Sequence, residues 1–549
     1  MMKFFRNRLV CLALTSAVVL PSMADIFESG GLYYNRLSEA EVEVTSSPDQ
    51  SYSGDITIPE SVSYDNANYS VVRIGNLAFG NCNELESVTM PNTVTAIEPL
   101  AFNGSGKLTS VTFGNGLISI GNDAFDGSGI TEISLPESLT EIGEKAFKGA
   151  YQLNNVKFGN SVTKIGAEAF QNCMSLTELK LPETLSEIGS YSFGNCQQLP
   201  TIDIPDNVRV IGSWAFSSCS NLAVVKLSAS LEIVEEGTFA QCSALTDIQI
   251  PASVTSIGNY AFAECLSLPE APIGENVQSI GAQAYSNCTS LTEVSLPNSV
   301  TSIGNLAFVG CDNMEKFSVG DGLTELPERM FMNCPKLKDV SLSIGIKEIK
   351  DETFSGCRAL ESIKLPEQLV YIGSHAFRWC ALYEINLPST LSVIGEEAFE
   401  GCNNLQNIVI PDGVTMIGKR AFASCISVEK VTLSSGLARI EDGMFQGCEK
   451  LFDVTIGGNV ETLGSEVFDH CIALGKIILP ESVKSIGLRA FNACTGLVEV
   501  WSTPRRHPCG EARSLCSAMI SITMYALSMS LIRQRAFTVR RKIGRTSKK

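Results

Sequence analysis

The stretch LPESLTEIGEKAF at residues 135–147 recurs in altered form along most of the chain, for example as LPETLSEIGSYSF at 181–193 and LPESVKSIGLRAF at 479–491. Its final aromatic returns every 22 or 23 residues and marks 19 successive units. These aromatics are Phe79, Phe102, Phe125, Phe147, Phe170, Phe193, Phe216, Phe239, Phe262, Tyr285, Phe308, Phe331, Phe354, Phe377, Phe399, Phe422, Phe445, Phe468 and Phe491. Such a period predicts a solenoid, because a unit this short must stack on its neighbours to bury its apolar side.

Each unit follows the pattern L-x-x-[IV]-x-[LI]-P-x-x-[VL]-x-x-I-G-x-x-A-F-x-x-C. The first part alternates apolar and polar residues and ends at a proline, which predicts a strand with one buried face that stops where the N–H donor is lost. A second short extended segment ends at a glycine, found four residues before the aromatic in 14 of the 19 units. We expect this glycine to allow a backbone turn that a side chain would obstruct.

These units resemble the BspA-like leucine-rich repeats of bacterial secreted and surface proteins, which have 23-residue units of the form LP..V..IG..AF..C. The resemblance covers residues 71–500. It implies a leucine-rich repeat solenoid, a right-handed superhelix of about 19 coils with parallel β-strands. It also implies a β-rich N-terminal cap at residues 25–70, where apolar and polar residues alternate as a segment that shields the first coil requires.

The two ends of the chain differ from the repeat. Residues 1–24 contain three basic residues, an apolar run and a small-residue site at 22–24, which is typical of a secretory signal peptide. The apolar run is too short to span a bilayer. We therefore expect a secreted or cell-surface protein with no transmembrane span in the mature chain.

Residues 501–549 form an anomalous tail with 11 basic residues and one acid. If the codons of residues 525–531 and 542–549 are read from their third base, permitted codon choices give C-T-L-Y-V-P and D-W-K-D-F-K, which are similar to the C-terminal cap of the family. We hypothesise a frameshift shortly after Trp501, so that this tail replaces the C-terminal cap. A basic anchor tail and a membrane segment at 518–532 are the alternatives.

The body of the chain is acidic. Residues 25–500 contain 27 basic and 58 acidic side chains, a formal charge of −31. A body with this charge repels phosphate backbones, so we expect no nucleic acid partner.

Sixteen of the 19 cysteines stand three residues after the aromatic: Cys82, Cys173, Cys196, Cys219, Cys242, Cys265, Cys288, Cys311, Cys334, Cys357, Cys380, Cys402, Cys425, Cys448, Cys471 and Cys494. The other three units have Ser105, Ser128 and Ala150, which share only small size with cysteine. This indicates a volume requirement rather than a bond. Disulfides between adjacent coils would leave Cys82 without a partner, and a column does not gather four ligands around a metal ion. We predict buried free thiols.

The sequence predicts no enzyme. His375 and His470 lie four units apart, roughly 20 Å in a solenoid, and neither has a partner position in neighbouring units; His507 lies in the tail. Acids such as Glu141, Glu187, Glu235 and Glu396 recur where the repeat needs only a solvated side chain, so we expect no glycosidase pair. No break in the period offers room for an active site. We therefore predict no catalytic, cofactor-binding or metal-binding residues.

The variable strand positions indicate what the protein does instead. They carry Lys157, Lys180, Lys226, Lys364, Asp203 and Gln249 among many Ser and Thr. A long, mostly polar face suits recognition of another macromolecule. The family resemblance implies an adhesin-like protein that binds extracellular proteins or glycans of a host or of other cells, such as matrix or plasma proteins. A structural repeat protein of the envelope without a specific ligand, and a carbohydrate-binding module, are the alternatives.

Overall fold

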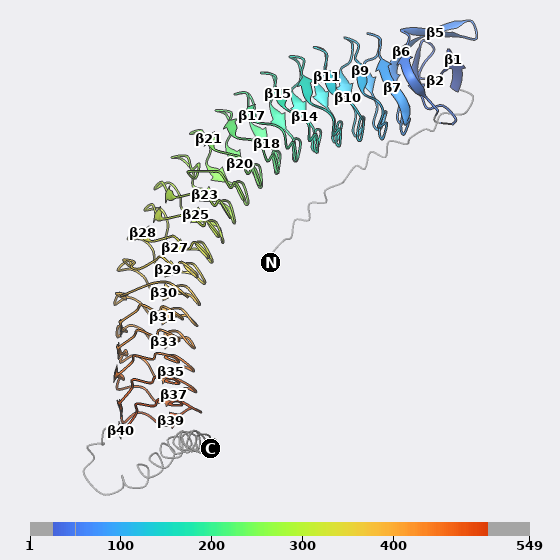
Figure 1. Cartoon of the computed structure of the whole chain (residues 1–549). Helices are drawn as coiled ribbons and strands as arrows, with labels where there is room; N and C mark the ends of the chain where they lie inside the picture. The colour runs from blue at the N-terminus through green and yellow to red at the C-terminus, as the bar shows by residue number, and fades with distance from the viewer. Residues whose placement is uncertain (1–25, 50, 503–549) are drawn as a thin grey trace, which may run out of the picture.

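The computed structural model describes residues 26–49 and 51–502. Within these ranges the chain forms 40 strands and no helix. The coils stack one on another into a curved rod (Figure 1). The predicted solenoid with parallel strands is confirmed, whereas the predicted signal peptide, His507 and the tail after residue 502 lie outside the described residues.

A small strand-rich segment begins the rod. Its strands are β1 (Ile26–Ser29), β2 (Leu32–Arg36), β3 (Glu41–Thr45), β4 (Ser53–Thr57), β5 (Ser61–Tyr64) and β6 (Ala67–Ile74). Strands β1, β2 and β3 pair antiparallel in sequence order, and β5 pairs antiparallel with β6. The segment joins the coils through parallel pairing of β6 with β8 and of β4 with β7.

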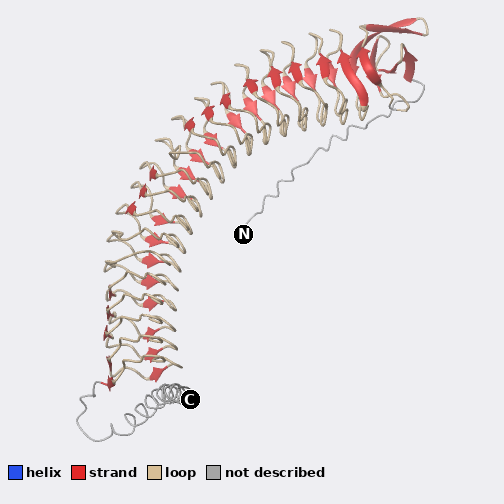
Figure 2. Ribbon diagram, in the orientation of Figure 1, coloured by secondary structure: helices blue, strands red, loops and turns tan. Residues whose placement is uncertain are grey.

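Two rows of strands run along the rod (Figure 2). The first, the short-strand row, consists of the two-residue segments that precede the glycine, and in most of them the second residue is buried. Its strands pair in parallel, as Ile120 with Ile142. They are β8 (Ala96–Ile97), β10 (Ser119–Ile120), β12 (Glu141–Ile142), β14 (Lys164–Ile165), β16 (Glu187–Ile188), β18 (Val210–Ile211), β20 (Ile233–Val234), β22 (Ser256–Ile257), β23 (Ser279–Ile280), β25 (Ser302–Ile303), β27 (Glu325–Leu326), β29 (Glu348–Ile349), β30 (Tyr371–Ile372), β31 (Val393–Ile394), β33 (Met416–Ile417), β35 (Arg439–Ile440), β37 (Thr462–Leu463) and β39 (Ser485–Ile486).

The second row, the ladder row, contains the strands that precede the proline position. Its members are β7 (Glu84–Thr89), β9 (Ser110–Thr112), β11 (Glu132–Ser134), β13 (Asn155–Lys157), β15 (Glu178–Lys180), β17 (Thr201–Asp203), β19 (Val224–Lys226), β21 (Asp247–Gln249), β24 (Glu293–Ser295), β26 (Lys316–Ser318), β28 (Asp339–Ser341), β32 (Asn407–Val409), β34 (Lys430–Thr432), β36 (Asp453–Thr455), β38 (Lys476–Leu479) and β40 (Glu499–Ser502). In the three-residue strands the middle residue is buried and its two neighbours point outward. This alternation follows from the two-residue period of a strand.

The repeated aromatic forms a continuous column inside the rod. Every consecutive pair of rings is stacked, with centroids between 4.8 Å and 6.3 Å apart. The one tyrosine in the column, Tyr285, is buried and donates its hydroxyl hydrogen bond to the carbonyl of Pro272 at 2.8 Å. Each ring thus covers the ring of the previous coil, which one unit could not do alone.

A side chain at the recurring glycine would be obstructed, as expected, but the obstruction comes from the backbone of the preceding coil. Gly281 has no left-handed backbone angle; a Cβ added there would lie 2.4 Å from the backbone nitrogen of Asn259 in the preceding coil. The left-handed residues stand two positions before and after the aromatic, for example Tyr260 (φ 56°) and Glu264 (φ 59°). Their N–H groups and that of Phe262 all donate to the next coil, at 2.8–2.9 Å. These hydrogen bonds offset the backbone strain of left-handed non-glycine residues.

Candidate recognition surface

The outward-pointing residues of the ladder row form a surface along the rod, which we call the ladder face. The third residues of successive strands are neighbours: Lys157 pairs with Lys180, and Lys226 lies between Asp203 and Gln249. The structure therefore brings these variable strand positions into one column. Lys364 occupies the same repeat position and is exposed, although its coil has no strand in the ladder row.

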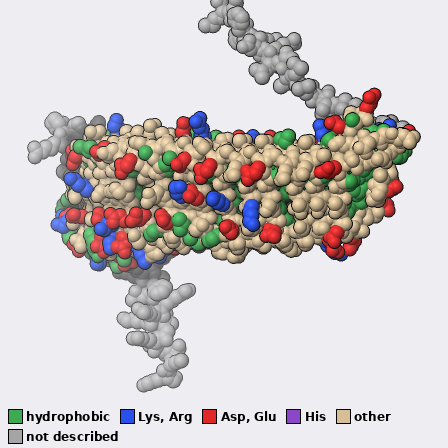
Figure 3. All heavy atoms as spheres, turned by 90° about the horizontal axis from the view of Figure 1, so that it is seen from above, with side chains coloured by type: hydrophobic (Ala, Val, Ile, Leu, Met, Phe, Trp, Pro, Cys, Tyr) green, Lys and Arg blue, Asp and Glu red, His purple; other side chains and the backbone are tan. Residues whose placement is uncertain are grey.

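Charges on the ladder face are exposed and weakly paired. The Lys226 ammonium lies 2.9 Å from the Asp203 carboxylate, and both side chains are about two-thirds exposed. Pairs of this kind contribute little to stability, typically about 0–1 kcal/mol. Seen from above the rod, charged side chains are sparse over much of the surface and denser toward the left of the view (Figure 3). The ladder face can therefore vary in sequence without endangering the fold.

The ladder row is interrupted, although the sequence period gave no sign of it. No strand forms in the coil at 269–273, apart from a bridge of Glu270 to Glu293, because Pro269 and Pro272 lack N–H donors. Two successive coils, at 361–365 and 383–387, have no strand in this row. The period of the units nevertheless continues through these coils, because each unit keeps its aromatic.

The cysteine column lies beside the aromatic column. The fifteen cysteines from Cys173 to Cys494 are free thiols, and all but the partly exposed Cys494 are buried, as predicted. Each donates a hydrogen bond to the carbonyl of the aromatic in the preceding coil, as Cys265 Sγ does to Phe239 at 3.2 Å. Ser105 makes the equivalent bond to Phe79 at 2.6 Å. The fifteen cysteines and Ser105 thus add a hydrogen bond that the repeat pattern did not reveal, whereas Ala150 has no donor and Ser128 Oγ has no hydrogen-bond partner. Small size is therefore the property that all members of the column share.

Burial makes these thiols unsuitable as nucleophiles. Burial raises the pKa of the Cys219 thiol to about 12, with the same direction and cause at Cys265. Because the thiolate is the nucleophile and the metal ligand, such groups remain inert near neutral pH. Among residues 26–49 and 51–502, no three side chains of His, Cys, Asp or Glu gather in a way that could hold a metal ion.

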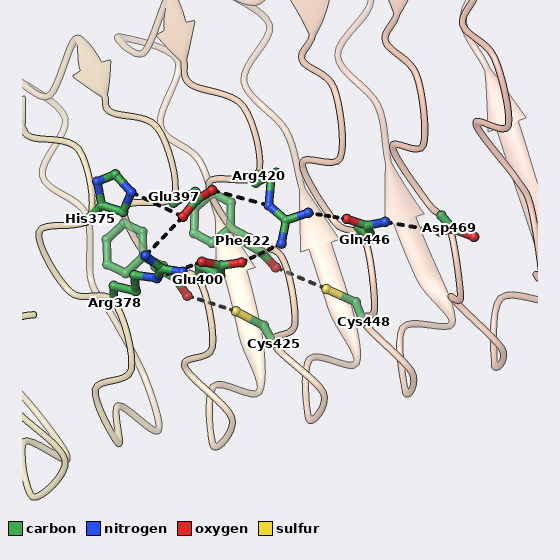
Figure 4. A network of polar contacts seen from close by, with 11 residues as sticks. His375, Arg378, Glu397, Glu400, Arg420, Phe422, Cys425, Gln446, Cys448 and Asp469 are labelled. Carbon is green, nitrogen blue, oxygen red and sulfur yellow. Dashed lines mark hydrogen bonds and ion pairs between the residues drawn. The ribbon is translucent and has the colours of Figure 1, made fainter. Parts of the chain in front are cut away.

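A chain of polar side chains crosses the coils near the C-terminal end (Figure 4). This polar chain consists of His375, Arg378, Glu397, Glu400, Arg420, Gln446 and Asp469. Glu400 is at its centre: its side chain is only 8% exposed, and it forms ion pairs with Arg378 at 2.7 Å and Arg420 at 2.5 Å. Gln446 accepts a hydrogen bond from Arg420 and donates one to Asp469 at 3.1 Å.

The pKa values of the two glutamates in the polar chain are shifted in opposite directions. Burial opposes ionisation of Glu400, but hydrogen bonds from Arg420 and Glu397 and the charges of both arginines outweigh it, so its pKa is lowered. Burial and the neighbouring Glu400 raise the pKa of Glu397. Such perturbed carboxylates mark functional sites or structural ion-pair networks. Glu400 Oε1 accepts a hydrogen bond from Arg420, and Oε2 forms an ion pair with Arg378, which indicates a structural role.

A family model described as the BspA type leucine rich repeat region matches residues 56–177, 163–292, 255–383 and 370–498. The chain belongs to this BspA-type leucine-rich repeat family. The resemblance drawn from the LP..V..IG..AF..C units is therefore confirmed. A search of curated proteins finds no match to the sequence.

Solved structures similar to this BspA-type protein come from several bacteria. A leucine-rich repeat protein from Bacteroides ovatus is 28% identical, over 74% of this chain and 94% of its own, with a TM-score of 0.54. A leucine rich cell surface protein from Faecalibacterium prausnitzii is 24% identical, over 78% of this chain and 94% of its own, with a TM-score of 0.32. The pneumococcal vaccine antigen PcpA is 16% identical, over 87% of this chain and 98% of its own, with a TM-score of 0.32. The first of these supports the leucine-rich repeat fold.

The histidines and carboxylates singled out in the sequence lie apart in this BspA-type protein. His375 Nε2 lies 3.1 Å from Glu397 of the next coil, so the expectation that it has no partner there is wrong. His470 Nδ1 instead lies 2.9 Å from Asp469 of its own coil. Of the four recurring acids, Glu187 forms an ion pair with Lys164 at 3.2 Å; the other three, Glu141, Glu235 and Glu396, belong to different coils.

The polar chain could have been found in the sequence of this BspA-type protein by aligning its units. Residues 20–23 positions apart meet across coils, so Glu400 faces Arg378 and Arg420. The signal is a charged residue directly after the aromatic. Ala423 and Ser217 show that a small residue also fits at this repeat position.

In the part of the chain that the structure describes, no helix has the length and hydropathy needed to cross a membrane.

Proposed function

We propose that this is a non-enzymatic, secreted or cell-surface protein that binds extracellular macromolecules through the ladder face, in an adhesin-like role. The observation that supports it most is the ladder face itself. Successive coils present outward residues such as Asp203, Lys226 and Gln249 in register on a rod that is stacked internally. Solenoids use surfaces of this kind to bind large partners without a deep pocket.

The proposed location and partners have separate support. Residues 1–24 have the composition of a signal peptide, and one similar structure is described as a cell surface protein. The acidic body argues for extracellular proteins or glycans as partners, rather than nucleic acid. We also propose residues 25–70 as the N-terminal cap, and 501–549 as a frameshifted replacement of the C-terminal cap, which sequencing of the coding DNA after codon 501 would test.

The test of this function compares the full chain with a variant of equal composition. In the variant, the outward residues of the ladder row are shuffled among coils, while all buried residues are kept. Both proteins are applied to immobilised matrix proteins, plasma proteins and glycans. We expect the native chain to bind at least one class and the shuffled variant to lose that binding. Equal, weak binding by both would remove the adhesin proposal and favour a structural role in the envelope.

A further inference from the structure

The interruption of the ladder row coincides with a shortened unit. The spacing from Phe377 to Phe399 is 22 residues, because one residue fewer stands between Cys380 and Leu382 than between Cys357 and Leu360. The sheet of β28 ends before this point, and a new sheet begins at β32. The buried positions nevertheless stay in register, since Ile363, Ile385 and Ile408 are all buried. The coil at 383–387 therefore lacks only the pairing of its backbone.

Backbone groups are left available at the interruption. The N–H of Tyr383 donates to Glu361 at 3.0 Å, and the N–H of Gln406 donates to Tyr383 at 3.2 Å. Within the described residues, no backbone hydrogen bond joins positions 384–387 to either neighbouring coil. In an ordinary coil the residue after the strand does pair, as Leu296 does with Ser318 at 2.9 Å.

A groove of about 620 Å³ opens at this place, between the coil at 383–387 and the coil at 406–411. Its rim carries the Tyr383 ring, which is 48% exposed, and the Val409 side chain, which is 61% exposed. Its polar lining comes from Glu384, Asn386, Gln406 and Asn407. The groove therefore combines a half-exposed aromatic side chain with amide and carboxylate groups and available backbone groups.

This chemistry favours one class of ligand. No basic side chain lines the groove, and the body of the protein is acidic, so an anionic ligand would be repelled. An added peptide strand would need the two coils to move about 4.8 Å further apart, but Gln406 bonds to Tyr383 on one side and Thr415 to Ser392 at 3.0 Å on the other. A sugar ring has an apolar C–H face that stacks on an aromatic ring and hydroxyl groups that pair with amides and carboxylates.

We propose that the groove between residues 383–387 and 406–411 binds a neutral saccharide, with its ring stacked on Tyr383. This inference rests on the proposed function, because the groove is part of the ladder face and the saccharide is one of the extracellular partners proposed above. The ligand would be held by the side chains of Glu384, Asn386 and Asn407 and by backbone groups that lack partners in the neighbouring coils.

The test uses the full chain on an array of immobilised neutral oligosaccharides terminated by galactose, N-acetylglucosamine, mannose or glucose, with sialylated and sulfated oligosaccharides beside them. We expect binding to at least one neutral type. Tyr383→Ala should weaken that binding by about tenfold or more. Tyr151→Ala is the matched control, because Tyr151 is also exposed, at 56%, but stands far from the groove in the sequence; we expect it to bind like the native chain.

A second variant tests the polar lining of the groove. Asn386→Ala removes an exposed amide that would pair with the sugar hydroxyl groups, so saccharide binding should weaken while the unfolding midpoint is retained. Neutral-saccharide binding that survives Tyr383→Ala, or binding to anionic oligosaccharides alone, would overturn the inference. If the chain binds immobilised proteins through the ladder face but no saccharide, the inference fails and the proposed function stands.

Discussion

The aromatic column and the ladder row run side by side along the same coils, yet one is continuous and the other is broken. The column keeps every ring stacked from Phe79 to Phe491. The ladder row is divided into separate sheets, and the coils at 361–365 and 383–387 have no strand in it. The difference teaches that the stacking of coils depends on the buried turn around the aromatic, whereas the ladder row tolerates interruption and is free to serve recognition.

The largest expected effect comes from breaking the aromatic column. Phe262 is fully buried and stacks at 5.7 Å on Phe239 and at 5.4 Å on Tyr285. Phe262→Ala should lower the free energy of unfolding by about 3–5 kcal/mol because it leaves a cavity between two rings. Lys226→Ala on the ladder face should change it by less than about 0.5 kcal/mol. Urea denaturation of both variants checks the contrast, and equal effects would contradict it.

The next effect concerns the polar chain. Glu400→Gln should destabilise the protein by about 2–3 kcal/mol at pH 7, because two guanidinium groups lose their buried counter-charge. The pKa of Glu400 is lowered in the folded state, so its contribution is present above the unfolded value of about 4.3 and is lost as pH falls through the folded value. The raised pKa of Glu397 acts oppositely: the stability it gives at low pH is lost as pH rises through its folded value.

Unfolding midpoints of the native chain and Glu400→Gln, measured between pH 3 and pH 7, check this prediction. We expect the two proteins to differ most near pH 7 and to approach each other toward pH 3. A difference that stays constant across this range would show that the charge of Glu400 does not stabilise the fold. Lys107→Ala is a suitable control, because Lys107 forms an ion pair with Glu84 in which both side chains are exposed.

A smaller effect tests the close approach of the coils. Gly281→Ala should cost about 1–3 kcal/mol, because the new Cβ would lie 2.4 Å from Asn259 nitrogen and would push the coils apart. Gly458→Ala is the matched control, since nothing lies within 4 Å of a Cβ added there. Thermal melting distinguishes them. Equal melting temperatures for the two variants would mean that the coils can separate without cost.

The smallest effect separates volume from hydrogen bonding in the cysteine column. Cys265→Ala should cost about 1–2 kcal/mol, since it removes both sulfur volume and the bond to the Phe239 carbonyl. Cys265→Ser should cost less, because serine can still donate to that carbonyl, as Ser105 does to Phe79. Denaturation in urea compares the two variants. A serine variant no more stable than the alanine variant would leave volume as the sole requirement.

The period of the sequence was enough to predict the solenoid, the parallel strands and the buried cysteine column, because each depends on residues that repeat. It was not enough to predict the left-handed backbone angles. These angles occur at residues with side chains as different as those of Tyr260, His375 and Trp379. No side chain marks them, because hydrogen bonds to the next coil impose the conformation. The interruption at 383–387 also escaped, because the apolar residues Leu382, Ile385 and Leu387 keep the pattern of the repeat.

The most direct test of the division between the two regions is the stability of the shuffled variant, in which only outward ladder residues change place. If stacking depends on the aromatic turn and recognition on the ladder face, the variant should unfold at the urea midpoint of the native chain and lose binding to the immobilised partner. A midpoint well below that of the native chain, or binding that is retained, would contradict the account.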